Sequence, residues 1–82
     1  MSKFPMQGQE YRIAYKLYSR DGKRAVDVLE FISGEIYLDE QEWVGGTDFK
    51  NRHAGSLVGP FASTEEAEKF IVGTSWFLGS AT

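Results

Sequence analysis

The stretch Gly59–Ala67 constrains the fold more than any other segment, because it carries the signals of a strand end, a turn and a helix start. Ser63 stands where its side chain can accept a hydrogen bond from the backbone of the first helical turn. Glu66 follows three residues later and can bond back to the Ser63 amide, which completes a capping box. The pattern therefore predicts a turn followed by a capped helix in the C-terminal third of the chain.

Apolar and polar residues alternate strictly from Tyr11 to Tyr18, and Asp21-Gly22 follows. Such alternation is typical of a β-strand, and Asp-Gly between two such runs is a strong hairpin signal. We predict that Tyr11, Ile13, Tyr15 and Leu17 share one face of the sheet. A two-residue loop would pair Leu17 with Val26, Tyr15 with Val28, Ile13 with Glu30 and Tyr11 with Ile32, and, on the other face, Tyr18 with Ala25, Lys16 with Asp27, Ala14 with Leu29 and Arg12 with Phe31.

Residues 35–39 form a third predicted strand after a turn at Ser33-Gly34, and two registers are open for it. A two-residue loop pairs Phe31 with Ile36, whereas a three-residue loop with a bulge pairs Ile32 with Ile36 and places Ile36 on the Tyr15 face. Residues 39–43 extend this strand or form a short turn of helix. Residues 45–55 are the longest irregular segment expected, and residues 56–58 form a short strand.

Residues 64–78 have apolar side chains at helical spacing, with Gly73 as a possible bend or stop and Gly79 as the C-terminal stop. The predicted fold class is α+β: an antiparallel β-meander of three to four strands with one C-terminal α-helix packed on one face. Eighty-two residues are enough for one domain. We assign residues 1–9 to a flexible N-terminal arm and residues 10–82 to a single domain.

Composition and charge exclude several classes of protein. The chain has no cysteine, which rules out disulfides and thiolate metal sites. It has no secretory h-region and no apolar run near the ~20 residues of a membrane span, so we expect a cytoplasmic protein without membrane association. Residues 1–24 carry six basic side chains and residues 25–47 carry six acidic ones. This asymmetry favours opposite-charge pairs across neighbouring strands, and a bipolar surface for self-association is the alternative.

The residues that could carry chemistry are few. His53 is the single histidine, and a small enzyme using it is a further alternative, which would need an acid or hydroxyl beside His53 in a pocket. No catalytic residue is assigned. Asp39, Glu40 and Glu42 lack the spacing of a calcium loop, which favours a solvated acidic edge over a cation site. We therefore predict no metal and no cofactor.

Residues 57–70, LVGPFASTEEAEKF, resemble the strand–turn–helix half of SPOR domains, a family that binds peptidoglycan glycan. The likeness covers fourteen of the 82 residues. The other strand and helix of that family have no counterpart in this sequence, so no binding residue is carried over.

The predicted hairpin has large apolar residues on both faces, and one helix can cover only one of them. We predict a non-enzymatic protein-binding or regulatory module that binds a protein partner or a second copy of the chain. Its candidate contacts are Tyr18, Leu29 and Phe31 on the sheet, and Val72 and Trp76 on the helix flank. The alternative is a single-stranded nucleic-acid platform made of Arg12, Lys16, Tyr18, Arg20 and Phe31, which the net charge of -3 opposes.

Overall fold

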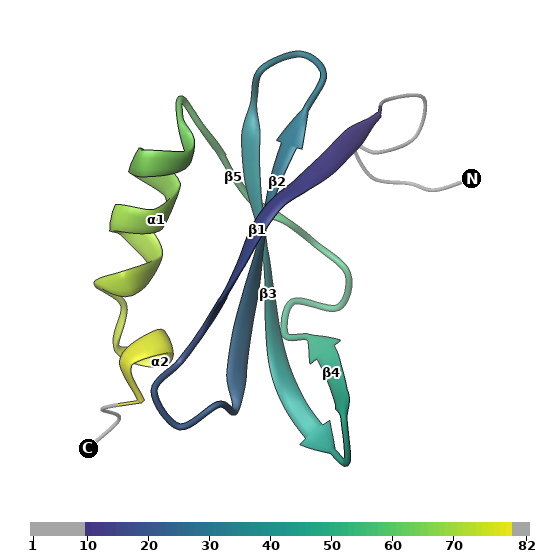
Figure 1. Cartoon of the computed structure of the whole chain (residues 1–82), viewed down its shortest axis with the longest axis vertical. Helices are drawn as coiled ribbons and strands as arrows, with labels where there is room; N and C mark the ends of the chain where they lie inside the picture. The colour runs from purple at the N-terminus through teal and green to yellow at the C-terminus, as the bar shows by residue number, and fades with distance from the viewer. Residues whose placement is uncertain (1–9, 80–82) are drawn as a thin grey trace.

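The computed structural model describes residues 10–79, which form one antiparallel sheet followed by two helices (Figure 1). The elements are β1 (Tyr11–Tyr18), β2 (Arg24–Phe31), β3 (Ile36–Gly45), β4 (Asp48–Asn51), β5 (Val58–Phe61), α1 (Thr64–Val72) and α2 (Ser75–Leu78). Strands β1 to β4 are neighbours in chain order, and β5 also pairs with β3. The predicted α+β meander with a helix against it is confirmed. The arm predicted at residues 1–9 lies outside the described residues.

One half of the predicted capping box is present at the start of the helical segment, whereas the bond from the Ser63 amide back to the Glu66 carboxylate is not formed among the described residues. The Ser63 hydroxyl accepts a hydrogen bond of 3.1 Å from the backbone N–H of Glu66. The segment differs from one continuous helix, because α1 ends at Gly73 and α2 begins after a new cap, in which the Thr74 hydroxyl accepts from the N–H of Phe77. Gly79 ends α2 with a positive φ of 72°, a conformation that glycine adopts without strain.

The core lies between the helices and one side of the sheet, which we call the helix face. Its buried residues are Val26 and Val28 of β2, Ile36 and Leu38 of β3, Ala67 and Ile71 of α1, and Phe77 of α2. Tyr15 and Leu17 of β1 pack against this cluster. Each fully buried Val, Leu, Ile or Phe side chain stabilises the fold by about 1.5–3 kcal/mol.

The first hairpin has the predicted register only near its turn. Lys16 pairs with Asp27, and Leu17 pairs with Val26, as expected. Between Ile13 and Tyr15 the register shifts, because Ala14 is an extra residue on β1. The prediction that Tyr11 and Ile13 share a face with Tyr15 is therefore wrong. The bulge turns both residues to the far face, the side of the sheet away from the helices.

Beyond the bulge, Tyr11 pairs with Phe31 and Ile13 pairs with Leu29. The pairings predicted for the outer half of this hairpin are therefore wrong by one residue. The predicted two-residue loop at Asp21-Gly22 is also wrong, because the Ser19 N–H donates to the Arg24 carbonyl at 2.8 Å and the loop therefore covers residues 20–23. Within it the Gly22 N–H donates to the Ser19 carbonyl at 3.0 Å. The register beside the turn is unchanged, because the longer loop is centred on the same two residues.

Strand β3 takes neither of the two registers that the sequence left open, since Ile36 pairs with Glu30. The loop has three residues, 32–34, and is closed by the Phe31 N–H donating to the Glu35 carbonyl at 3.0 Å. Ile36 nevertheless lies on the Tyr15 face, as the second alternative required. Residues 39–43 belong to β3 and are not helical.

Residues 45–55 are more regular than expected. Gly45 and Gly46 have φ values of 131° and 57° and turn the chain from β3 into β4. Glycine adopts such positive φ values without strain, so these two residues form a tight turn between two paired strands. The prediction of one long irregular segment is therefore wrong. The last strand lies at Val58–Phe61 rather than at residues 56–58, since its pairing with β3 extends to Phe61 opposite Ile36.

Candidate binding surface

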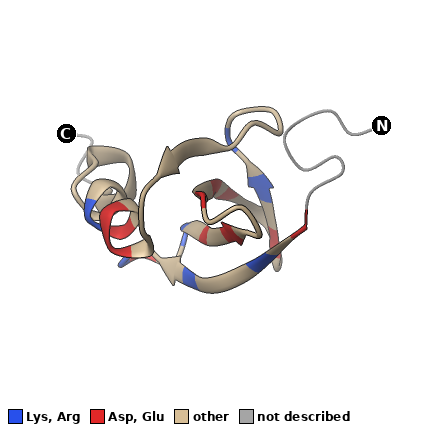
Figure 2. Cartoon of the chain, turned by 90° about the horizontal axis from the view of Figure 1, so that it is seen from above, with Lys and Arg blue, Asp and Glu red and all other residues tan. Residues whose placement is uncertain are grey.

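Leu29 and Phe31, two predicted contact residues, lie on the far face but are buried, with 4% and 2% of their surface exposed. The rings of Tyr11 and Tyr37 each pack against Phe31 with centroids 5.2 Å apart. The sheet is curved rather than flat, with the helices outside the curve (Figure 2). Its own aromatic side chains thus cover this end of the far face. Leu29 and Phe31 are therefore removed from the candidate surface.

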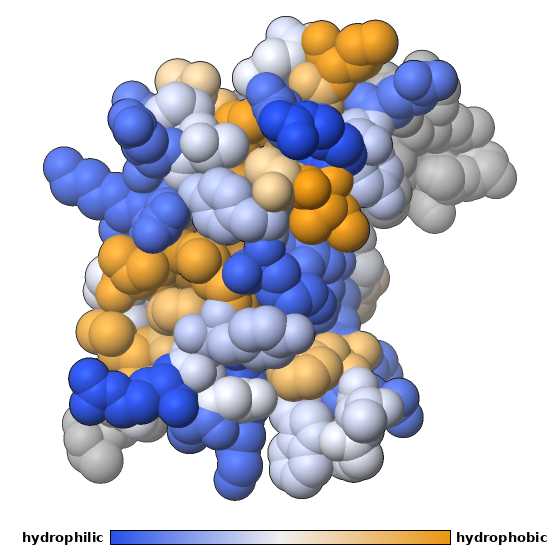
Figure 3. Space-filling view, in the orientation of Figure 1, coloured by the Kyte–Doolittle hydropathy of each residue, from blue (hydrophilic) through white to orange (hydrophobic). Residues whose placement is uncertain are grey.

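The helix flank does not form one strip either. Val72 is exposed at the end of α1, whereas Trp76 lies in α2, beyond the break at Gly73. The Trp76 indole N–H donates to Glu42 at 2.7 Å, and the Arg52 guanidinium lies over its ring, 4.3 Å from the centroid. Figure 3 shows the apolar surface on the visible side as separate patches with hydrophilic residues between them. Trp76 is thus engaged in contacts within the fold.

Tyr18 remains exposed, at 58%, and it lies in a cluster that the sequence did not reveal. Its ring meets the Phe49 ring edge to face with 6.2 Å between centroids. Phe49 in turn pairs with Trp43 across β3 and β4, and 43% of Trp43 is exposed. Three rings from three strands therefore gather on the far face.

Two lysines border these rings. The ammonium group of Lys16 lies 5.7 Å from the Tyr18 centroid and 5.9 Å from that of Phe49. The ammonium group of Lys23 lies 5.7 Å from the Trp43 centroid. These are cation–π distances. We call the set Lys16, Tyr18, Lys23, Trp43 and Phe49 the aromatic–lysine surface.

A polar network beside this surface holds the strands in register. Asp27 of β2 lies opposite Asp39 of β3. The Lys16 ammonium forms an ion pair with the Asp27 carboxylate at 3.2 Å. The Gln41 side-chain amide donates to both carboxylates at 3.0 Å, and the Asn51 amide donates to Asp39 at 2.8 Å. The pairing of Lys16 with Asp27 confirms the expected cross-strand charge pair. The network neutralises much of the charge of Lys16.

The predicted acidic edge is split between the two faces. Asp39 lies in the far-face network, whereas Glu40 points to the helix face and is only 4% exposed. A solvated edge is therefore wrong for Glu40, because alternation along β3 turns its side chain inward. Within residues 10–79, no group of three or more His, Cys, Asp or Glu side chains is placed to hold a metal ion.

His53 contacts the buried carboxylate of Glu40 rather than a nucleophile. One oxygen, Oε1, meets His53 Nε2 at 2.9 Å and Arg52 Nη1 at 3.3 Å. Arg52 also covers the Trp76 ring, which ties the turn after β4 to α2. Since both donors converge on one oxygen, the cluster has the geometry of a structural ion pair.

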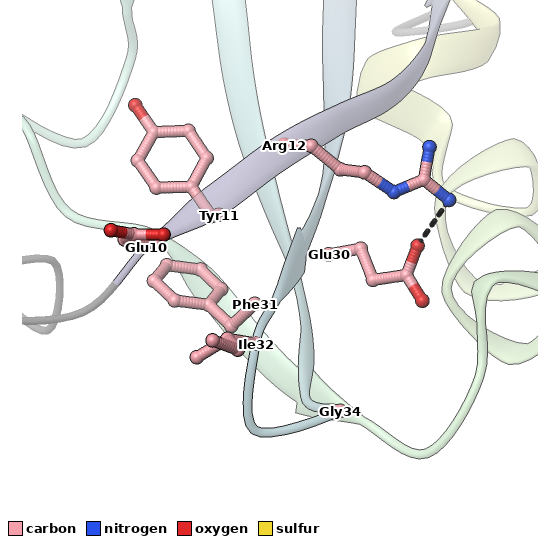
Figure 4. Close-up of a pocket in the computed structure, with 7 residues that line it drawn as sticks. All are labelled: Glu10, Tyr11, Arg12, Glu30, Phe31, Ile32 and Gly34. Carbon is pink, nitrogen blue, oxygen red and sulfur yellow. Dashed lines mark hydrogen bonds and ion pairs between the residues drawn. The ribbon is translucent and has the colours of Figure 1, made fainter.

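A hollow of about 410 Å³ lies at the open end of the first hairpin (Figure 4). Tyr11, Phe31 and Ile32 line one side of it. Arg12 and Glu30 point the other way and bond to each other at 2.6 Å. Its polar groups thus do not converge on a common point, which a ligand site requires.

The residues of the nucleic-acid alternative are not brought together. Arg12 is paired with Glu30 on the opposite side of β1 from Tyr11, and Phe31 is buried. Of that set, Lys16 and Tyr18 are in contact on the far face. Sequence reasoning missed Trp43 and Phe49, although Gly45-Gly46 between them was an available hairpin signal.

No family model, no curated protein and no solved structure matches the chain, and this includes the SPOR domains that residues 57–70 resemble. Neither helix in the described part of the chain has the length and hydropathy needed to cross a bilayer.

Proposed function

We propose that the chain is a non-enzymatic protein-binding module and that it binds its partner through the aromatic–lysine surface. The supporting observation is the gathering of Tyr18, Trp43 and Phe49 on one face, with Tyr18 and Trp43 largely accessible. Tyrosine and tryptophan are enriched among the residues that dominate binding energy at protein interfaces. A cytoplasmic location stays part of this proposal.

The surface is preorganised, because each ring stands on a strand rather than on a flexible loop. Tyr18 lies at the end of β1, Trp43 lies in β3 and Phe49 lies in β4. The hydrogen bonds between Gln41, Asp27 and Asp39 hold β2 and β3 together next to the rings. Little conformational entropy of these side chains is therefore lost when a partner binds, which favours affinity.

Charge favours a protein partner over a nucleic acid. The ammonium group of Lys16 is paired with Asp27, and Asp39 lies beside that pair. A strand of phosphates needs cations that follow its backbone, and the net charge of the chain is -3. Single-stranded DNA is therefore the competing ligand to include in the test.

The test is a selection from a random peptide display library against the wild-type protein. Selected peptides are expected to bind Tyr18→Ala and Trp43→Ala at least tenfold more weakly than the wild type. Val72→Ala is the matched control, because Val72 is exposed on α1 and lies outside the surface. Circular dichroism of each variant confirms that it is folded.

Two results would contradict the proposal. One is a set of peptides that lose affinity for Val72→Ala but bind Tyr18→Ala and Trp43→Ala normally. The other is a selection without binders combined with tight, salt-dependent binding of a dT oligonucleotide, which would favour the nucleic-acid function. Sedimentation equilibrium over a concentration series distinguishes binding of a partner from self-association.

A further inference from the structure

The aromatic–lysine surface presents hydrogen-bond donors to a ligand. Tyr18 is largely exposed, and its hydroxyl has no hydrogen-bond partner within residues 10–79. The exposed Lys23 takes part in none of the ion pairs found in that part of the chain. Its ammonium group carries three N–H donors and no acceptor. A ligand that lies across the rings therefore meets at least two side chains that are free to donate.

The hydrogen-bond acceptors beside the rings are already used. Both carboxylate oxygens of Asp39 accept from side-chain amides, one from Gln41 and the other from Asn51. Asp27 is buried, with its Oδ1 in the ion pair with Lys16 and its Oδ2 accepting from Gln41. The surface thus has free donors, and each carboxylate oxygen in the adjoining network already has a partner.

We propose that the partner presents a proline-rich segment in the polyproline II conformation to this surface; this rests on the proposed function. Proline has a backbone carbonyl but no backbone N–H. Such a segment brings acceptors for the free donors and few N–H groups that need acceptors in return. An ordinary peptide brings one N–H per residue, and an N–H that loses water without gaining an acceptor costs free energy.

The rings give a proline-rich segment a rigid apolar platform. Tyr18 and Trp43 stay largely exposed although the ammonium groups of Lys16 and Lys23 lie 5.7 Å from their respective ring centres. The Trp43 indole N–H donates to the Gly46 carbonyl at 2.8 Å, which fixes the orientation of its ring. Polyproline II segments bind aromatic-lined surfaces well because their conformation is formed before binding. Little conformational entropy is therefore lost on either side.

Charge favours an uncharged segment over an acidic or a basic one. The two positive charges of Lys16 and Lys23 are equal in number to the negative charges of Asp27 and Asp39, which lie in the adjoining network. The surface and this network together therefore have no net charge. Carbonyl oxygens satisfy the lysine donors without adding a charge that would need compensation.

The test uses two blocked decapeptides, ten prolines and five Ala-Ser repeats, titrated into the ¹⁵N-labelled protein. The proline peptide is expected to bind at least tenfold more tightly and to shift the Trp43 indole N–H signal. Tyr18→Phe keeps the ring but removes the hydroxyl and is expected to weaken this binding at least twofold, whereas the control Tyr11→Phe leaves it unchanged. Lys23→Met is expected to weaken it at least threefold, and the control Lys69→Met, on α1, less than 1.5-fold.

The outcomes separate this inference from the function on which it rests. Equal affinity for the two decapeptides, or no binding of the proline peptide, would overturn the proline-rich partner. The protein-binding function would still stand if display-selected peptides without proline lost affinity for Tyr18→Ala and Trp43→Ala. Proline-peptide binding that is unchanged by both Tyr18→Phe and Lys23→Met would also overturn the inference, because the free donors would then have no part in recognition.

Discussion

The ring of Tyr18 in β1 meets the ring of Phe49 in β4 with 6.2 Å between centroids, although β2 and β3 lie between their strands. Two outer strands of a flat four-stranded sheet stand too far apart for such contact, since neighbouring strands are about 4.8 Å apart. The sheet therefore curls toward its far face at this end. The curl gives the three rings a common surface, on which Tyr18 and Trp43 are exposed and Phe49 is half-buried, and it leaves Ala25 fully buried beneath them.

The contact predicts an energetic coupling between these two residues. In a double-mutant cycle with Tyr18→Ala and Phe49→Ala, we expect a coupling of about 0.5–1 kcal/mol in the free energy of unfolding. Urea denaturation of the wild type, both single variants and the double variant gives this value. Tyr18 with Val72 serves as the control pair, for which additivity is expected. Additive effects of Tyr18→Ala and Phe49→Ala would mean that the sheet is not curled as described.

Gly59 is predicted to resist substitution. Its φ is 147°, and a Cβ atom there would lie 2.8 Å from the Ile36 carbonyl oxygen, which belongs to the backbone of β3. We expect Gly59→Ala to lower the free energy of unfolding by about 2 kcal/mol or more. Gly73→Ala is the matched control, because its nearest neighbours would be at 3.6 Å and its φ is -94°. Equal stability of the two variants in urea would contradict this account of β5.

Glu40 is predicted to stabilise the fold rather than to act in catalysis. Glu40→Gln keeps the size of the side chain but removes the charge that Arg52 and His53 share. We expect a loss of about 2 kcal/mol in the free energy of unfolding, because the carboxylate is buried. Glu30→Gln removes the charge of an exposed pair with Arg12 and is expected to cost less than about 1 kcal/mol. A larger loss for Glu30→Gln would reverse the assignment.

The first turn is predicted to depend on pH through Asp21. Its carboxylate accepts from the Ser19 hydroxyl at 2.7 Å and from the Lys23 N–H at 2.9 Å. These bonds, with the Ser19 bond contributing most, hold the pKa of Asp21 below its ordinary value. A carboxyl group whose pKa is lowered by folding stabilises the folded state at pH values above its ordinary pKa. This stability is lost as the pH falls through the folded-state pKa.

The measurement is the urea midpoint of the wild type and of Asp21→Asn between pH 7 and pH 3. Asn keeps an acceptor oxygen, so the variant removes the charge and little else. The wild type is expected to have the higher midpoint at pH 7, and the difference is expected to shrink below about pH 4. A difference that stays constant or grows as the pH falls would show that the charge does not stabilise the turn.

Structural features that depend on a few neighbouring residues could be predicted from the sequence. The cap at Ser63 and the pairing of Lys16 with Asp27 depend on neighbours along the chain or next to one turn, and both are present. The bulge at Ala14 was not readable, because a methyl group is compatible with either face of a strand. That one extra residue moved Tyr11 and Ile13 to the far face.

Most of the candidate surface could not be predicted from the sequence, because it depends on the curvature of the whole sheet. The bulge at Ala14 places the Tyr11 ring opposite Phe31, and Tyr37 on the neighbouring strand packs against the same ring, so Phe31 is buried along with Leu29. Curvature brings Phe49 against Tyr18 from the other edge of the meander. Gly45-Gly46 could have indicated the hairpin that holds Trp43 and Phe49, but no local pattern indicates its contact with β1.

The most direct test of the binding surface is a chemical-shift map of the ¹⁵N-labelled protein with a display-selected peptide. The proposal predicts the largest changes at the Trp43 indole N–H and at the amides of Tyr18 and Phe49, with little change in α1. Changes concentrated on α1 and α2, around Phe70 and Val72, with Tyr18 and Trp43 unaffected, would contradict it.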